Sequence, residues 1–175
     1  KNIGIILGTE GLNFLNKIDE VYLLYEEGIR VFGLNWNKDT KFSTSLKTTT
    51  NKGLTKEGRQ LVRVLEALPV IIDLAHSSIY TFKDILKIYR KPVIFSHNGF
   101  KKLVNFEQNL NIESLRFLKK INGLIGLTRL PKSINIKGKI SFENWLKSFQ
   151  YLRKEFKNNL AIGTDFFGFE FNENY

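Results

Sequence analysis

The sequence has 175 residues, a length that suits one domain over residues 1–175. Hydrophobic residues make up 42% and charged residues 25%, which is the balance of a globular chain that can bury a core, and it argues against intrinsic disorder. Cysteine is absent, so the sequence excludes a disulfide framework and a thiolate metal site, and it favours a cytoplasmic location. No apolar run approaches the ~20 residues of a membrane span, so we expect none.

The formal net charge of +10 raises the question of nucleic-acid binding. A nucleic-acid-binding protein usually gathers its basic residues in a patch with aromatic residues nearby. Here Lys and Arg are spread over nearly every predicted helix, which favours solvated helix faces. We therefore expect no nucleic-acid partner, and keep this function as a third hypothesis that rests on charge alone.

Short apolar segments alternate with amphipathic ones along the chain. Segments rich in Ile and Val predict six strands buried on both faces, at residues 3–7, 30–34, 70–74, 93–95, 124–127 and 160–162. The segments between them show helical spacing of apolar residues, with Gly28 as a helix stop and Asn111 and Ser141 as N-caps. We expect the aromatic stripe that begins at Phe142, like the other apolar stripes, to lie in the core.

Repeated β/α units predict a parallel sheet, either closed as a barrel or open and doubly wound. No G-x-G-x-x-G motif follows a predicted strand, which argues against a dinucleotide-binding fold. Residues 37–53 are polar, rich in Thr and Lys, and without periodicity, so they predict a long loop.

The two histidines of the sequence each follow a predicted strand at its carboxyl end. His76 follows the strand at 70–74 and His97 the strand at 93–95, 21 residues later. That spacing allows one helix and a return to the next parallel strand, so both imidazoles should lie at the same rim, where barrel enzymes place their active sites.

Two carboxylates occupy equivalent positions. Glu10 follows the first predicted strand and Asp165 the last, each beside glycine residues. Imidazoles and carboxylates together are typical zinc ligands, so the four residues predict a metal site, whereas each alone is more often a polar cap or a carboxylate at a helix start. Asp73 interrupts an apolar strand and is either a partner of an imidazole or an acceptor facing the loop.

At these residues the sequence resembles the zinc membrane (renal) dipeptidase family, within the metal-dependent hydrolase barrels. The resemblance is most specific around His76 and His97 and covers nearly the whole chain, through residues 8–11, 23–30, 53–62, 72–78, 91–98, 109–110 and 162–168. It implies a TIM-type (β/α) barrel, of which about six β/α units fall within this sequence. We expect the beginning and end of that barrel either to lie outside it or to be lost from the protein.

The resemblance also implies the chemistry. Glu10 would bridge two zinc ions, and His76 and His97 would complete the ligands of one of them. Asp165 would lie by the other zinc and carry protons around a bridging hydroxide that attacks a peptide bond. The implied substrate is a small dipeptide-like peptide, and a homodimer is expected from the family.

The sequence departs from the family pattern at the substrate side. The family's His-x-Asp pair on the first barrel strand is absent, which puts the second zinc in question. Trp36 stands where the family has a substrate-binding histidine, and Gln108, just before Asn109, where it has a carboxylate-binding arginine. Phe167 replaces an acidic residue. Trp36, Gln108 and Asn109 are the expected substrate-binding residues.

Two main hypotheses follow. The first is a zinc-dependent dipeptidase-like hydrolase, with its metal at Glu10, His76, His97 and Asp165 and with Asp165 as the catalytic residue. The alternative is a catalytically degenerate homologue that keeps the fold for binding or structure, and Trp36 and Gln108 favour it.

Overall fold

A computed structural model describes residues 2–135 and 141–165 of the chain. Its centre is one sheet of six parallel strands in the order β1-β2-β3-β4-β5-β6. The strands are β1 Leu7–Glu10, β2 Ile29–Gly33, β3 Ile71–Asp73, β4 Val93–Asn98, β5 Leu124–Leu127 and β6 Leu160–Ile162.

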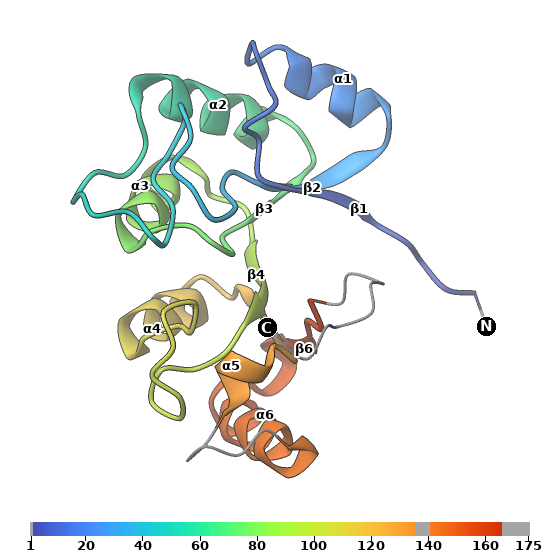
Figure 1. Cartoon of the computed structure of the whole chain (residues 1–175). Coiled ribbons are helices and arrows are strands. Elements are labelled where there is room, and N and C mark those ends of the chain that lie inside the picture. The colour runs from blue at the N-terminus through green and yellow to red at the C-terminus, as the bar shows by residue number, and fades with distance from the viewer. Residues whose placement is uncertain (1, 136–140, 166–175) are drawn as a thin grey trace.

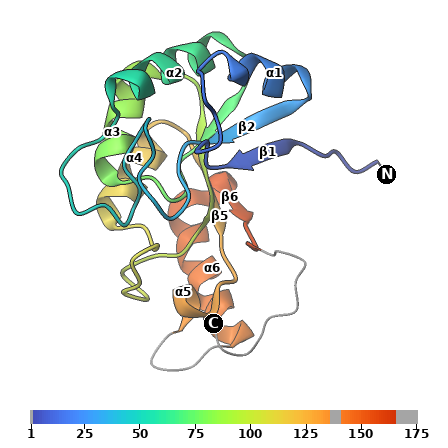
Figure 2. The ribbon, with the colours of Figure 1, turned by 45° about the horizontal axis from the view of Figure 1, so that its top comes forward.

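Helices connect successive strands and lie around the outside of the curved sheet (Figures 1 and 2). They are α1 Glu20–Glu26, α2 Lys56–Ala67, α3 Ile79–Ile88, α4 Ile112–Lys120, α5 Pro131–Ile134, α6 Phe142–Phe156 and the short 3₁₀ helix η1 Lys157–Asn159. A doubly wound sheet would break the sequential strand order. The order and curvature therefore confirm the predicted fold class, a partial TIM-type barrel of six strands.

The first strand is the largest correction to the sequence-based prediction. We predicted a strand over residues 3–7, but β1 begins at Leu7 and runs to Glu10. The register explains the difference, because β1 pairs with β2, and that ladder starts where Leu7 meets Ile29. The apolar residues before Leu7 have no ladder partner within the described chain and are exposed, Ile3 by 90% and Ile5 by 82%.

Helix ends follow the sequence signals. The side chains of Asn111 and Ser141 accept hydrogen bonds from the backbone N–H groups of Ser114 and Asn144, so both predicted N-caps are confirmed. Gly28 follows α1 with a φ of +96°, the left-handed conformation of a helix stop. The predicted core position of Phe142 is wrong, because this side chain is 69% exposed at the start of α6.

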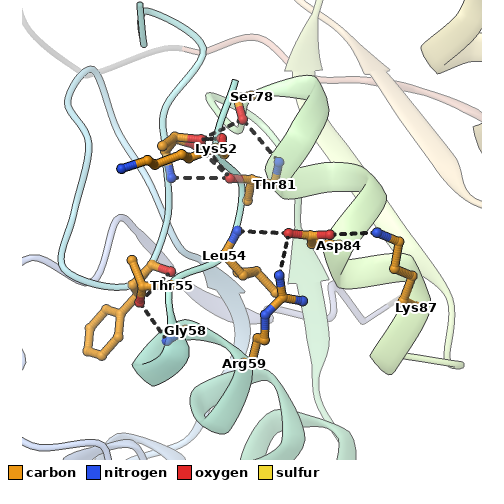
Figure 3. Close-up of polar contacts among 11 residues, drawn as sticks. Lys52, Leu54, Thr55, Gly58, Arg59, Ser78, Thr81, Asp84 and Lys87 are labelled. Atoms are coloured by element: carbon orange, nitrogen blue, oxygen red, sulfur yellow. Dashed lines mark hydrogen bonds and ion pairs between the residues drawn. The ribbon is translucent and has the colours of Figure 1, made fainter. Parts of the chain in front are cut away.

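The long loop over residues 37–53 is present, and buried hydroxyl groups attach it to α3. Thr44 Oγ1 lies 2.7 Å from the Oγ of Ser78 and 3.1 Å from the Oγ1 of Thr81. Just beyond the loop, the Asp84 carboxylate accepts hydrogen bonds from the backbone of Leu54 and the guanidinium of Arg59 (Figure 3). These contacts fix the loop near the carboxyl end of β3, beside the candidate site.

Within the part of the chain that the structure describes, no helix has both the length and the apolar character needed to cross a bilayer.

Candidate metal centre

The carboxyl ends of three strands bring three ligand-type side chains together. Glu10 is the last residue of β1, His97 lies near the end of β4, and His76 follows β3 by three residues. Parallel strands end at the same edge of a sheet, and the sheet curves so that β1 approaches β3 and β4 across its inner side. The predicted convergence at one rim is therefore what the structure shows for these three residues.

The three side chains contact one another directly. Glu10 Oε1 lies 3.0 Å from His76 Nε2 and 3.2 Å from His97 Nε2. The two Nε2 atoms are 2.9 Å apart, and the ring centroids are separated by 5.0 Å. One carboxylate oxygen and two imidazole nitrogens thus form a triangle with nearly equal sides.

The donor set fits a zinc ion. Three nitrogen or oxygen ligands at 2.0–2.1 Å from a tetrahedral zinc lie about 3.3 Å from one another. The triangle at Glu10, His76 and His97 needs to expand by only a few tenths of an ångström to reach that spacing. Neutral imidazoles with a carboxylate are typical ligands of zinc, whereas calcium and magnesium take oxygen ligands.

The same contacts set the charge of the site. Hydrogen bonds from His76 and His97 lower the pKa of Glu10 to about 2, against the opposing effect of its partial burial. Burial of the His97 ring disfavours its charged form, but the hydrogen bond to Glu10 and the negative charges of Asp165, Asp73 and Glu10 outweigh it and raise the pKa of His97. Glu10 is therefore ionised at neutral pH, as a metal ligand must be.

The backbone is strained at two of the predicted site residues. His76 has a φ of +63° and Asp165 a φ of +55°, a left-handed conformation that costs residues with a Cβ about 1 kcal/mol or more. At His76 the turn directs the chain back toward the loop at Ser45, where the carbonyl of His76 accepts the N–H of Leu46. Such strain is often found at functional sites.

Asp165 lies near the triangle without joining it. Its charge contributes to the raised pKa of His97, yet it is absent from the group of Glu10, His76 and His97, whose ligand atoms all lie within 4.8 Å of one another. Burial raises the pKa of the Asp165 carboxyl above its usual value, and this outweighs the neighbouring His97. Asp165 thus stands at the margin of the site.

The expected substrate-binding residues lie at the same rim. The backbone of Trp36 packs against Gly11, next to Glu10, and its side chain is 49% exposed. The carbonyl of Gln108 accepts a 2.8 Å hydrogen bond from Asn98, the neighbour of His97.

Asn109 is buried, and its amide donates to the carbonyls of Val104 and Ser133. Its side-chain amide therefore joins the preceding segment at Val104 to α5 at Ser133. Phe167, the fourth departure from the family pattern, lies outside the described residues.

Sequence reasoning missed the hydroxyl that contacts the second imidazole. Ser96 Oγ lies 2.7 Å from His97 Nδ1, on the opposite side of the ring from Glu10. An adjacent hydroxyl in the sequence was a signal for this contact, but a regular strand would direct Ser96 and His97 to opposite faces. The irregular register between Phe95 and Asn98 is consistent with their meeting.

A partial (β/α) barrel with two imidazoles and a carboxylate at the carboxyl rim of its strands has the architecture of a barrel-type metalloprotein. Comparison with known sequences makes this class specific. Residues 1–174 match the sequence model of the family described as membrane dipeptidase, peptidase family M19. The chain belongs to this family.

Individual relatives agree with this assignment. The chain is 31% identical over 128 residues to an uncharacterized dipeptidase, C965.12, of Schizosaccharomyces pombe, an alignment that covers 70% of this chain and 31% of that protein. It is 26% identical over 170 residues to the dipeptidase verJ of Clonostachys rogersoniana, covering 95% of this chain and 44% of that protein. The chain thus spans less than half the length of these relatives.

Solved structures show the same fold. A metallopeptidase from Rhodobacter sphaeroides, liganded with a phosphinate mimic of the dipeptide L-Ala-D-Ala, superposes with a TM-score of 0.81 at 23% identity, over 93% of this chain and 50% of that one. The dipeptidase AC, an M19 metallopeptidase, superposes with a TM-score of 0.83 at 23% identity, over 92% and 50% of the two chains.

Proposed function

We propose that this chain forms the metal-binding part of a zinc-dependent, dipeptidase-like hydrolase. The observation that carries the proposal is the convergence of Glu10 Oε1, His76 Nε2 and His97 Nε2 at separations of 2.9–3.2 Å. Membership of the M19 family supports the same reading. The phosphinate dipeptide mimic bound by the Rhodobacter sphaeroides relative supports a dipeptide as the class of substrate.

The chemistry of each side chain indicates its proposed role. Glu10, His76 and His97 would hold the metal, and what zinc supplies when bound is polarisation of a carbonyl and a more acidic water. Asp165 is the proposed proton carrier, because a carboxyl group with a raised pKa accepts and releases a proton closer to neutral pH. Trp36 and Gln108, at the same rim, are the proposed contacts for the substrate.

A homologue without catalytic activity is the second candidate function. Two departures from the family pattern favour it. Gln108 stands in place of a charged arginine, and Trp36 stands in place of a titratable histidine. Trp36 can donate one indole N–H but cannot transfer a proton, and the Gln108 amide lacks the charge that binds a carboxylate strongly. Such a protein would bind metal without hydrolysing peptides.

Elemental analysis and a peptide assay separate these functions. The chain should be purified with zinc, assayed against a panel of dipeptides with L- or D-residues at the carboxyl end, and assayed again with a chelator. If the chain is part of a zinc hydrolase, it should contain bound zinc and hydrolyse dipeptides, and the chelator should abolish this hydrolysis. Bound zinc without hydrolysis supports the homologue without activity, and absence of zinc contradicts the proposed metal site.

The matched variants are Glu10→Gln and Glu26→Gln. Glu10→Gln removes the charge of the central carboxylate at the site, and should lose both zinc and hydrolysis. Glu26 is an exposed carboxylate of α1, so Glu26→Gln should change neither. Hydrolysis that survives Glu10→Gln would show that peptide cleavage does not depend on this site.

A further inference from the structure

One buried carboxylate connects the two strand ends that carry the histidines. Asp73, the last residue of β3, is 8% exposed. Its Oδ1 accepts the backbone N–H of Ala75 at 3.0 Å and the backbone N–H of Ser96 at 3.0 Å. Ala75 immediately precedes His76, and Ser96 immediately precedes His97. A single oxygen atom therefore accepts the backbone N–H of the residue that precedes each histidine.

The contact with Ser96 replaces a bond of the parallel ladder. Up to Leu74 the strands pair regularly, and Leu74 N–H donates to the Ile94 carbonyl at 2.8 Å. In a regular ladder the next bond would join the Ser96 N–H to a main-chain carbonyl of the β3 segment. Here the Asp73 side chain accepts that N–H, so the chain after β3 is free to turn away at Ala75.

The contact with Ala75 shapes that turn. An aspartate that accepts the N–H two residues later forms a side-chain turn, which reverses the chain locally. The turn delivers His76 with its φ of +63°, so that Nε2 meets both Glu10 and His97. Within residues 2–135 and 141–165, no hydrogen bond joins Asp73 to either imidazole. Its charge contributes to the raised pKa of His97 through space, but its effect on the positions of the rings passes through the backbone.

We propose that Asp73 is a positioning residue that sets the distance between the His76 and His97 imidazoles through these two backbone hydrogen bonds. The inference deepens the proposed metal site and rests on it for its functional meaning, but the arrangement of the rings can be measured without metal. Because the acceptor atom matters more than its charge, Asp73→Asn should keep the geometry through its carboxamide oxygen. Asp73→Ala should lose it.

The test uses NMR on the chain with isotopically labelled histidine and a chelator present. The sequence has two histidines, so the imidazole signals belong to two rings without further assignment. With ring centroids 5.0 Å apart, the wild type should give a nuclear Overhauser effect between the rings. That effect should persist in Asp73→Asn and disappear in Asp73→Ala.

Cobalt(II) titration, followed by its absorption, gives the second measurement. Replacement of residues that orient metal ligands typically costs 10–100-fold in metal affinity, so we expect that loss for Asp73→Ala and near wild-type affinity for Asp73→Asn. The control is Asp84→Ala, which removes another carboxylate that accepts a backbone N–H but lies at Leu54, Arg59 and Lys87 (Figure 3). It should lower the unfolding temperature while leaving the ring contact and cobalt affinity unchanged.

The outcomes separate this inference from the proposed function. An unchanged contact between the rings in Asp73→Ala overturns the positioning role, whatever the metal result. If Asp73→Ala does not fold, loss of the ring contact in folded Asp73→Asn overturns it instead. A wild-type chain that shows the ring contact, loses it in Asp73→Ala and binds no cobalt supports the positioning role and contradicts the metal site.

Discussion

Ser96 places its hydroxyl oxygen 2.7 Å from Nδ1 of His97, while Nε2 of the same ring faces Glu10. An imidazole that donates its Nδ1–H to such an oxygen keeps a free electron pair on Nε2 for a metal. Ser96 and Glu10 thus act on opposite ends of one ring.

Ser96→Ala should therefore weaken metal binding without removing a ligand. We expect about a tenfold loss of zinc or cobalt affinity, at the lower end of the effect of a hydrogen-bond partner of a metal-bound histidine. Competition with a chromogenic chelator measures it. Ser114→Ala is a suitable control, because Ser114 is a buried serine of α4. Equal affinities for Ser96→Ala and wild type would show that the hydroxyl does not orient the ring.

The charge network predicts a pH window for the stability of the metal-free chain. The pKa of Glu10 in the folded chain is about 2, below its ordinary 4.5, so its contribution is present above pH 4.5 and is lost as the pH falls toward 2. The pKa of His97 is raised above 6.5, so its contribution is present below pH 6.5 and is lost as the pH rises through the raised value.

The two contributions coincide between about pH 4.5 and 6.5. The difference in unfolding temperature between wild type and Glu10→Gln, with chelator present, should be largest in that window and smaller on both sides. Thermal unfolding by circular dichroism measures it, with Glu26→Gln as the control. A difference that does not vary with pH would contradict an ion pair at Glu10.

Close packing around the carbonyl of Ser96 predicts that replacing either of two glycines destabilises the fold. A Cβ on Gly163 would lie 1.8 Å from the Ser96 oxygen, and a Cβ on Gly126 would lie 1.9 Å from it. Gly163→Ala should cost about 1–3 kcal/mol in the free energy of unfolding, as overpacking does, and should displace the peptide before His97. Denaturant unfolding tests this. Gly4→Ala is the control, because nothing lies within 4 Å of its added Cβ.

The left-handed backbone of His76 predicts an order of stability among its variants. At a φ of +63° glycine avoids the steric cost that a Cβ imposes, about 1–2 kcal/mol, although its flexibility in the unfolded chain offsets part of this gain. Metal-free His76→Gly should therefore be more stable than His76→Ala by about 0.5–1 kcal/mol. At His97, which is not among the residues with positive φ, the order should reverse. Urea unfolding measures both pairs.

The sequence was sufficient to predict the features that depend on local pattern. Apolar runs, helix caps and the positions of Glu10, His76 and His97 at strand ends predicted a parallel sheet with these three side chains at one rim, and the structure shows this arrangement. The start of β1 could not be predicted, because the apolar run before Leu7 is distinguished only by the absence of a partner in β2. The contact between Asp73 and Ser96 depends on where the chain after β3 leaves its ladder with β4, which no local pattern specifies.

The contact between Glu10 and the histidines also has a mechanical consequence for the sheet. Among the described residues, β1 lies at the edge of the sheet and has ladder bonds to β2 alone, yet its last side chain reaches β4 and the segment after β3. This contact joins two separated parts of the curved sheet across its concave side, so it opposes flattening of the sheet. Metal binding at the proposed site should therefore slow amide hydrogen exchange in β1, whose residues lie outside the buried core, and leave exchange in the buried turns of α6 unchanged.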